Sequence, residues 1–558
     1  MKKIICLLLV VFMLIPLFAA CANEEKKGEI KEDQGDSQND SAADANGKEN
    51  ADTDSDAGAD TDSDTGADTD TDTDTDTDTD ADCDTDVDAD YEDGGVDGDD
   101  YYEVIDPSDE TVVLENDFIK TEIQNVSTFS SDVDTASYTL FRRMVQSGYN
   151  LSELMATAGK SIRTEEMINY FDYGYENPKD GELFSTKMQI APCPWNENAA
   201  LLMLGLQAKK IETASQNNLV FLIDVSGSMG SADKLALLKK SFSHLVDKLD
   251  ENDTVSIVTY ASGEKVVLEG CAGSKKEMIM NAINSLTANG ATNGQAGMQK
   301  AYGVAEKYYI PGGNNRIILA SDGDLNVGIS SVEGIKAFVT EKKESGVFLS
   351  VLGFGSENYK DGMMEAIADC GNGVYYYIDG AFEAEKVFGQ DLFATLYTVA
   401  KDVKLQLTFD ANYVDSYRLI GYENRVLNNE DYENDNKDAG EMGAGHSITV
   451  CYELILTEGA MESEDTNPWL TLGVRYKEPD GEKSQEQTYI FGKEVYTDLP
   501  DDQYAFVCAV IEASMILRKS QFIGNITMGD VYQSLLSLDF GEDAYKVQFR
   551  ELIRMLAR

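Results

Sequence analysis

Histidine is almost missing from this sequence, whose 558 residues include only His244 and His446. Neither lies in a Gly-rich strand–helix elbow, so a Ser-His-Asp type of nucleophilic site is not predicted. The eight cysteines form no Cys-x-x-Cys pair and no Cys/His cluster, which leaves structural zinc without ligands. No GxxxxGK[ST] loop occurs, so nucleotide hydrolysis has no support.

Basic residues are scarce, because 45 Lys and Arg face 102 Asp and Glu, for a net charge of −57. A polyanion does not neutralise phosphates, which argues against nucleic-acid binding. More than half of this charge lies in an Asp/Thr-rich stretch at 22–111, which cannot bury enough apolar surface to fold. Its alternating aspartates could also suggest calcium loops, but the glycines are misplaced for an EF-hand and no Glu closes a loop. A solvated, disordered spacer is the favoured interpretation.

No apolar run is long enough to span a bilayer comfortably. The run at 4–18 follows two lysines and precedes small residues, which is typical of an export signal at 1–20. The segment LFAAC at 17–21 resembles a bacterial lipobox, with cleavage before Cys21 and lipid on its thiol. A plain secretory signal with an incidental cysteine is the alternative. We therefore expect 21–111 to be a lipidated cysteine plus acidic linker, tethering the chain to the extracytoplasmic face of a bacterial cell membrane.

The remaining sequence divides into three regions by pattern. Residues 112–214 mix strand and helix patterns and predict an N-terminal α+β region. Residues 215–396 alternate short apolar strands with helices, which predicts an α/β domain with a doubly wound, mostly parallel, Rossmann-like sheet. Residues 397–558 alternate like half-exposed antiparallel strands and end in helices, which predicts a β-rich region with terminal helices.

Oxygen-bearing side chains follow two of the α/β strands. Asp224, Ser226 and Ser228 come directly after the apolar run at 219–223. Asp322 ends a later strand, at the same sheet edge, and Thr292 lies in a Gly-flanked loop between two helices. All five are hard oxygen donors, which suit Mg²⁺ or Ca²⁺ rather than a soft metal. Helix capping explains one of these side chains but not all of them.

This pattern resembles the metal-ion-dependent adhesion site of von Willebrand factor type A domains. The family motif is DxSxS after the first strand, then a Thr in a Gly-flanked loop and an Asp in an (S/T)DG motif, and all five positions match. The segments STFSSDVDTASY, RTEEMINYFDYGY and APCPWN extend the resemblance to a bacterial group of type A lipoproteins, over roughly 120–558. The resemblance implies a divalent cation, Mg²⁺ first and Mn²⁺ or Ca²⁺ as alternatives. It also implies a protein or peptide partner whose Asp or Glu carboxylate completes the metal shell.

In adhesion relatives the state of this site is coupled to movement of the last helix of the domain, for which the candidate here is 384–400. Three alternatives remain open: a degenerate site, a surface scaffold whose metal is only structural, and a metal-dependent hydrolase. A phosphatase of the haloacid dehalogenase type needs a second Asp as general acid, and here that position is Ser226. We therefore predict a binding protein without catalytic residues.

Overall fold

The structure is a computed structural model that describes residues 114–211, 216–323, 332–355, 361–462, 467–479 and 481–558. The predicted signal peptide, Cys21 and the acidic linker lie outside these residues. Among the described helices, none combines the length and the apolar character that a membrane crossing requires.

A doubly wound sheet forms the central α/β region, as predicted. Its strands run in the order β10-β9-β8-β5-β6-β7. Neighbouring strands are parallel except at the edge, where β7 is antiparallel to β6. The bounds are β5 (Asn217–Asp224), β6 (Thr254–Tyr260), β7 (Glu264–Ala272), β8 (Asn314–Ser321), β9 (Phe348–Phe354) and β10 (Tyr375–Ile378). The strand order reverses between β5 and β8, which is where such sheets bind ligands.

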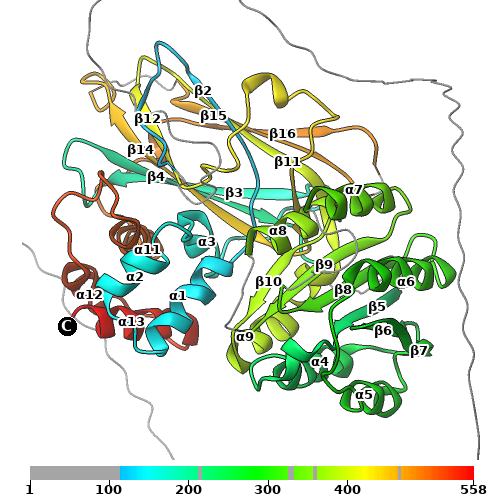
Figure 1. The fold of residues 1–558 in the computed structure, drawn as a ribbon. Coiled ribbons are helices and arrows are strands. Elements are labelled where there is room, and N and C mark those ends of the chain that lie inside the picture. The colour runs from blue at the N-terminus through cyan, green and yellow to red at the C-terminus, as the bar shows by residue number, and fades with distance from the viewer. Residues whose placement is uncertain (1–113, 212–215, 324–331, 356–360, 463–466, 480) are drawn as a thin grey trace, which may run out of the picture. The chain divides into compact units, whose positions relative to one another are not determined.

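Helices cover both faces of this sheet (Figure 1). Alternate residues of β5 enter two different cores: Phe221 packs with Phe242 of α4, whereas Leu222 packs with Met298 of α6. The continuous apolar run of β5 therefore reflects burial on both faces. The helices are α4 (Leu235–Lys248), α5 (Lys276–Asn284), α6 (Gly294–Lys307), α7 (Val332–Lys343) and α8 (Asp361–Cys370).

The N-terminal and C-terminal regions share their sheets instead of folding as separate bodies. One sheet has the order β1-β12-β14-β4-β3. A second sheet has the order β13-β11-β15-β16, and β2 also pairs with β11. Leu204 of the N-terminal region pairs with Val450 of the C-terminal region. The strands are β1 (Ile119–Lys120), β2 (Val126–Ser130), β3 (Phe184–Pro192), β4 (Ala200–Ala208), β11 (Thr398–Phe409), β12 (Val414–Ile420), β13 (Gly440–Gly443), β14 (Ser447–Leu456), β15 (Leu470–Lys477) and β16 (Gln485–Phe491).

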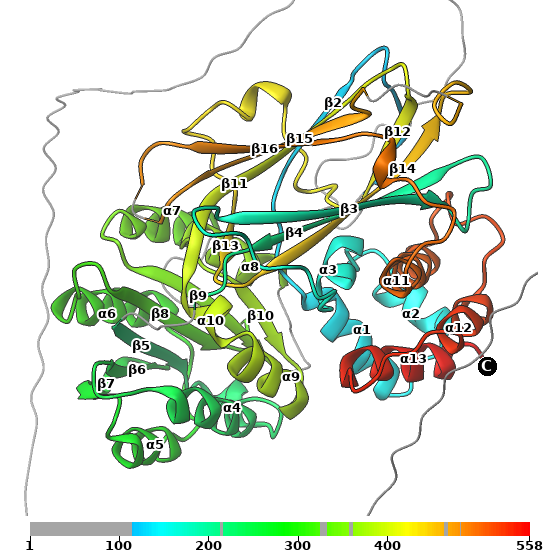
Figure 2. The ribbon, with the colours of Figure 1, turned by 180° about the vertical axis from the view of Figure 1, so that it is seen from behind.

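The expectation of half-exposed strands after residue 397 is wrong for β14, which is buried along most of its length. Val450 faces the core between the two sheets, and Cys451 faces a core made with helices. That helical layer combines segments from both chain ends, which lie side by side in both views (Figures 1 and 2). Its members are α1 (Ala136–Gln146), α2 (Leu151–Thr157), α3 (Thr164–Asn169), α11 (Asp502–Arg518), α12 (Met528–Leu536) and α13 (Ala544–Leu556).

The last helix of the α/β region is not the single helix expected over 384–400. The structure has α9 (Ala381–Glu385), a π-helical turn η2 (Lys386–Gln390) and a short α10 (Leu392–Leu396). Strand β11 begins at Thr398, so the end of the predicted helix is a strand. The α/β region therefore continues into the second sheet without a linker, and any movement of this helix would pull directly on β11.

His446 lies at the junction between the α/β sheet and β14. Its Nδ1 accepts a hydrogen bond from the Gly443 backbone N–H (3.1 Å), which places the ring proton on Nε2, 3.0 Å from the Tyr376 hydroxyl of β10. Burial lowers the pKa of His446 from 6.5 to about 4, an effect that Lys386 adds to and Asp391 opposes. The folded junction therefore requires neutral histidine.

Acidification should weaken this junction. Because the pKa of His446 is lower in the folded state, its contribution is complete above pH 6.5 and is lost as the pH falls toward 4. The loss should not exceed about 3 kcal/mol in the free energy of unfolding. Urea unfolding at pH 7, 5 and 4 measures it, with His446→Gln as the comparison. An equal pH slope in both proteins would contradict the prediction.

Candidate functional site

The carboxyl end of β5 carries the first three predicted ligands. Asp224 is completely buried, and its Oδ1 accepts a hydrogen bond from the Ser226 backbone N–H (2.8 Å). The Ser226 and Ser228 hydroxyl oxygens are 2.9 Å apart. Ser226 is buried and Ser228 is exposed, at the start of the 3₁₀ turn η1 (Gly227–Gly230). The three side chains thus form a path of oxygens from the interior to the surface.

The loop that carries Thr292 is fastened to this turn through its backbone. The Gly227 N–H donates to the Gly290 carbonyl (2.9 Å), and the Asn289 N–H donates to the Val225 carbonyl (2.8 Å). Gly290 has a φ of +89°, and a Cβ there would lie 2.6 Å from the Ser262 hydroxyl, so only glycine fits. Thr292 itself is buried, two residues beyond this contact. The structure therefore brings the Thr292 loop to the Asp224 turn.

Asp322 approaches from the next strand. It follows Ser321 at the end of β8, and the Ser321 hydroxyl donates to Asp224 Oδ2 (3.2 Å). Burial raises the pKa of Asp224 from 3.8 to about 6, and the neighbouring charge of Asp322 adds to this effect. A buried carboxylate whose ionisation a second carboxylate opposes is stabilised by a positive charge nearby. This donor set fits a hard divalent cation, and the five ligand assignments stay a prediction.

Comparisons with known proteins cover most of the described chain. Models described as "von Willebrand factor", "von Willebrand factor type A domain" and "Uncharacterized protein YfbK, C-terminal" match residues 109–203, 218–390 and 394–558. "Uncharacterized protein YfbK" of Escherichia coli (strain K12) is 39% identical over 463 residues, which cover 78% of this chain and 79% of the relative. The chain belongs to the YfbK family.

More distant relatives match only part of this YfbK-family chain, or resemble it in fold with low sequence identity. "Uncharacterized protein sll0103" of Synechocystis is 26% identical over 211 residues, 37% of this chain and 48% of that protein. The solved structure "von Willebrand factor type A from Catenulispora acidiphila" is 15% identical, with a TM-score of 0.38, and covers 66% of this chain and 88% of that one. The predicted type A domain is confirmed, and it indicates an interaction or adhesion type of function.

Lys234 is a residue of the site that sequence reasoning missed. Its ammonium group donates to Asp322 Oδ2 (2.9 Å), and both side chains are buried. Its stem packs against Gly355, where a Cβ would lie 2.3 Å from Lys234 Cε. The signal available in the sequence was a lone basic residue ten positions after Asp224, just before α4. Lys234 therefore supplies positive charge to Asp322 from within the chain.

Replacing Lys234 with Met should increase the affinity of the site for Mg²⁺ by roughly 10-fold, because a charge-assisted hydrogen bond of about 1.5–3 kcal/mol no longer competes for Asp322. The metal-free protein should melt at a lower temperature, since Asp322 loses its buried partner. Calorimetric titration and melting in EDTA measure the two effects. Lys240→Met, at an exposed position of α4, is the control, and unchanged Mg²⁺ affinity in Lys234→Met would contradict the prediction.

Proposed function

We propose that this YfbK-family protein is a lipid-anchored, extracytoplasmic bacterial protein that binds a protein or peptide ligand through a divalent cation. The cation ligands are Asp224, Ser226, Ser228, Thr292 and Asp322, and Mg²⁺ suits them best, with Mn²⁺ and Ca²⁺ as alternatives. An Asp or Glu carboxylate of the ligand completes the shell. The anchor is Cys21.

The observation that carries this proposal is the burial gradient along the three oxygens of the Asp224 turn. Asp224 is completely buried, and in a protein interior the attraction between a carboxylate and a cation is stronger than in water. Ser228 lies at the surface, and its hydroxyl is 2.9 Å from that of Ser226. A cation bound along this path would be held by Asp224 on its buried side. Its solvent-facing side, near Ser228, would be open to a ligand.

The charge of the site also favours an acidic ligand over a neutral one. Lys234 already offsets part of the charge of Asp322. With a divalent cation bound, Asp224, Asp322 and Lys234 leave a net positive charge of one unit. A ligand carboxylate neutralises that charge, and like-charged groups on a wrong partner would be repelled.

Capture of surface proteins tests the proposal. The full mature chain is immobilised and exposed to a surface-protein extract in Mg²⁺ and in EDTA, with Ser226→Ala and Asp224→Ala as variants. Ser243→Ala is the matched control, because Ser243 is half-buried on α4 and its hydroxyl donates to the Lys240 carbonyl (2.6 Å), away from the Asp224 turn. Capture by the wild type and the control in Mg²⁺ alone, with none by the other variants, is the expected result.

The melting temperatures of the same variants separate the binding function from a structural metal. Loss of capture without a lower melting temperature in EDTA supports the proposal. A Mg²⁺-dependent rise in melting temperature with no Mg²⁺-dependent partner supports a surface scaffold in which the metal only stabilises the fold. Mg²⁺-independent capture by all variants would contradict a metal-bridged ligand.

A further inference from the structure

An arginine of the N-terminal region reaches the edge of the type A sheet that carries the candidate metal site. Arg143 of α1 donates from Nη1 to the Gly355 carbonyl (3.2 Å) and also bonds the Tyr377 hydroxyl. Gly355 follows β9, at the same sheet edge as Asp322, which follows the neighbouring parallel strand β8. Gly355 also contacts the stem of Lys234, the lysine that pairs with Asp322. A continuous series of contacts therefore runs from α1 to a predicted metal ligand.

We infer that Arg143 is a positioning residue, which acts through Gly355 to hold Lys234 against Asp322 and so lowers the metal affinity of the site. The inference rests on the proposed function, in which Asp322 is a metal ligand. Lys234 and a divalent cation compete for the same carboxylate, so a contact that keeps the ammonium group in place opposes cation binding. The N-terminal region thus sets how readily the type A domain takes up its metal.

The contact between Gly355 and Lys234 is close. A Cβ at Gly355 would lie 2.3 Å from Lys234 Cε and 2.8 Å from Cγ, so the lysine stem lies directly against the glycine backbone. Gly355 is buried and has a φ of +92°. Lys234 is 7% exposed, and its ammonium group is 2.9 Å from Asp322 Oδ2. Because packed interiors contain few voids, the position of Gly355 restricts where this stem can lie.

Two donors from different regions hold the Gly355 carbonyl. The Tyr377 hydroxyl of β10 donates to it (2.7 Å), and Arg143 donates to it from α1. Arg143 Cζ also lies 5.3 Å from the centroid of the Tyr377 ring, a cation–π arrangement that keeps the guanidinium group beside the carbonyl. Tyr377 belongs to the type A domain itself. Arg143 is therefore the part of this arrangement that the N-terminal region contributes.

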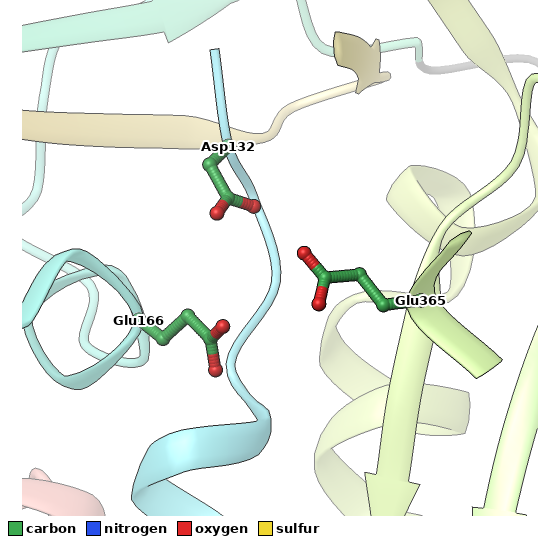
Figure 3. Close-up of side chains that lie close together, drawn as sticks. All are labelled: Asp132, Glu166 and Glu365. Carbon is green, nitrogen blue, oxygen red and sulfur yellow. The ribbon is translucent and has the colours of Figure 1, made fainter. Parts of the chain in front are cut away.

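The N-terminal region is joined to the type A domain at two further places, which fix the position from which Arg143 acts. The preceding residue, Arg142, is 2% exposed and pairs with Glu383 of α9 (2.8 Å). Arg163, just before α3, pairs with Glu365 of α8 (2.8 Å). Figure 3 shows the Glu365 carboxylate facing two carboxylates of the N-terminal region. Because breaking buried ion pairs is costly, α1 stays in place and Arg143 stays on Gly355.

Titration calorimetry with Mg²⁺ tests the inference on the full mature chain. Arg143→Met should increase the Mg²⁺ affinity by about 5-fold, less than Lys234→Met does, because Tyr377 still holds the carbonyl. In a chain that already carries Lys234→Met, adding Arg143→Met should change the affinity by less than about 2-fold, since the group that Arg143 positions is gone. Arg554→Met is the control, because Arg554 pairs with Glu551 of its own helix (2.7 Å).

Acetylation of lysines in EDTA gives a second readout that needs no metal. Lys234 is buried and paired, whereas Lys240 of α4 is exposed and serves as the reference within the same chain. Arg143→Met should raise the acetylation rate of Lys234 relative to Lys240 by about 5-fold, because the lysine leaves Asp322 more often. Mass spectrometry of the digested protein measures both rates.

The two readouts separate this inference from the proposed function. If the wild type binds Mg²⁺, an unchanged or lower affinity in folded Arg143→Met would overturn the inference and leave the proposed function standing. If the wild type binds no Mg²⁺, faster acetylation of Lys234 would show that Arg143 positions it although the metal site is wrong, and unchanged acetylation would overturn both. Where Arg143→Met gives no folded circular-dichroism spectrum, Tyr377→Phe replaces it with the same expected directions.

Discussion

Replacing Asp224 with Asn is expected to weaken Mg²⁺ binding by at least about 100-fold, because even changes in residues that only support metal ligands cost 10–100-fold. Asp224 is completely buried, and its two oxygens accept from Ser226 and Ser321. Asparagine keeps the shape and one acceptor oxygen but removes the charge. Titration calorimetry of the wild type and the variant measures the change.

The same substitution should stabilise the protein when no metal is present. Burial raises the pKa of Asp224 from 3.8 to about 6, so the folded state disfavours the ionised form. Stability is therefore lost as the pH rises from 3.8 to 6, and at pH 7 the cost is roughly 3 kcal/mol. Asparagine removes this cost but gives up a hydrogen bond of about 1 kcal/mol. In EDTA at pH 7, Asp224→Asn should melt at a higher temperature than the wild type.

These opposite effects distinguish loss of a metal ligand from general damage to the fold. A damaged variant would lose both metal affinity and stability in EDTA. At pH 4, where Asp224 is largely protonated in the folded protein, the stabilising effect of asparagine should nearly disappear. A lower melting temperature in EDTA at pH 7 would show that the Asp224 carboxylate is needed for folding itself.

The part of the fold that sequence predicts best is the type A sheet. Strands that are buried on both faces leave continuous apolar runs, and most of these runs are followed by a helix pattern within a short distance. The run before Asp224 illustrates this, since β5 occupies Asn217–Asp224 and its residues alternate between two cores. The five candidate ligands follow the same local logic, because four of them come directly after strands at one edge.

Long-range pairing is what the sequence could not provide. Leu204 and Val450 lie in strands that both read as ordinary alternating segments, and nothing local indicates that they are neighbours. The burial of β14 follows from this pairing, since helices from both chain ends then cover its outer face. The short strand β13 lies in a stretch that reads as a polar loop, because its burial comes from β11 beside it and not from its own residues.

A buried ionic cluster shows the same limit, because its members come from separate segments of the chain. Asp132, Glu166 and Glu365 lie together and pair with Arg163 and Arg425, but their spacing in the chain matches no motif. Lys234 was missed for a different reason. It lies close to Asp224 in the sequence, but its ion pair is with Asp322, which follows another strand. Sequence patterns therefore predict side chains that share a strand end, and they miss those that meet through packing.

Arg142 of α1 should be the most costly single residue to remove from the contact between the type A domain and the N-terminal region. It is 2% exposed, its Nε donates to Asp379 (2.8 Å) and its Nη2 donates to Glu383 (2.8 Å). The Tyr170 hydroxyl also donates to Glu383 (2.8 Å). Arg142→Met would leave two buried carboxylates without this cation, and breaking a buried ion pair costs about 3–5 kcal/mol.

Urea unfolding measures that loss, and a second substitution shows whether it comes from charge. Arg142→Met combined with Glu383→Gln should recover part of the stability, because one of the stranded carboxylates is then neutral. Lys120→Met is a control for loss of an ion pair at the surface, where the pair of Lys120 with Asp415 (2.6 Å) is expected to contribute no more than about 1 kcal/mol. Equal losses of stability for Arg142→Met and Lys120→Met would contradict a large contribution of the buried ion pairs of Arg142.

The ion pairs of Arg142 also affect whether the last helix of the type A domain can move between two positions. Glu383 lies in α9, directly before the π-helical turn, and π-helical turns often mark functional positions. With Arg142 fixed to the start of this helix and β11 continuing from its end, movement must break buried contacts at both ends. We expect hydrogen exchange at 381–396 to be slow in the wild type with or without Mg²⁺, and to become faster and Mg²⁺-dependent in Arg142→Met. Exchange that is already Mg²⁺-dependent in the wild type would mean that the helix moves even with the ion pairs of Arg142 in place.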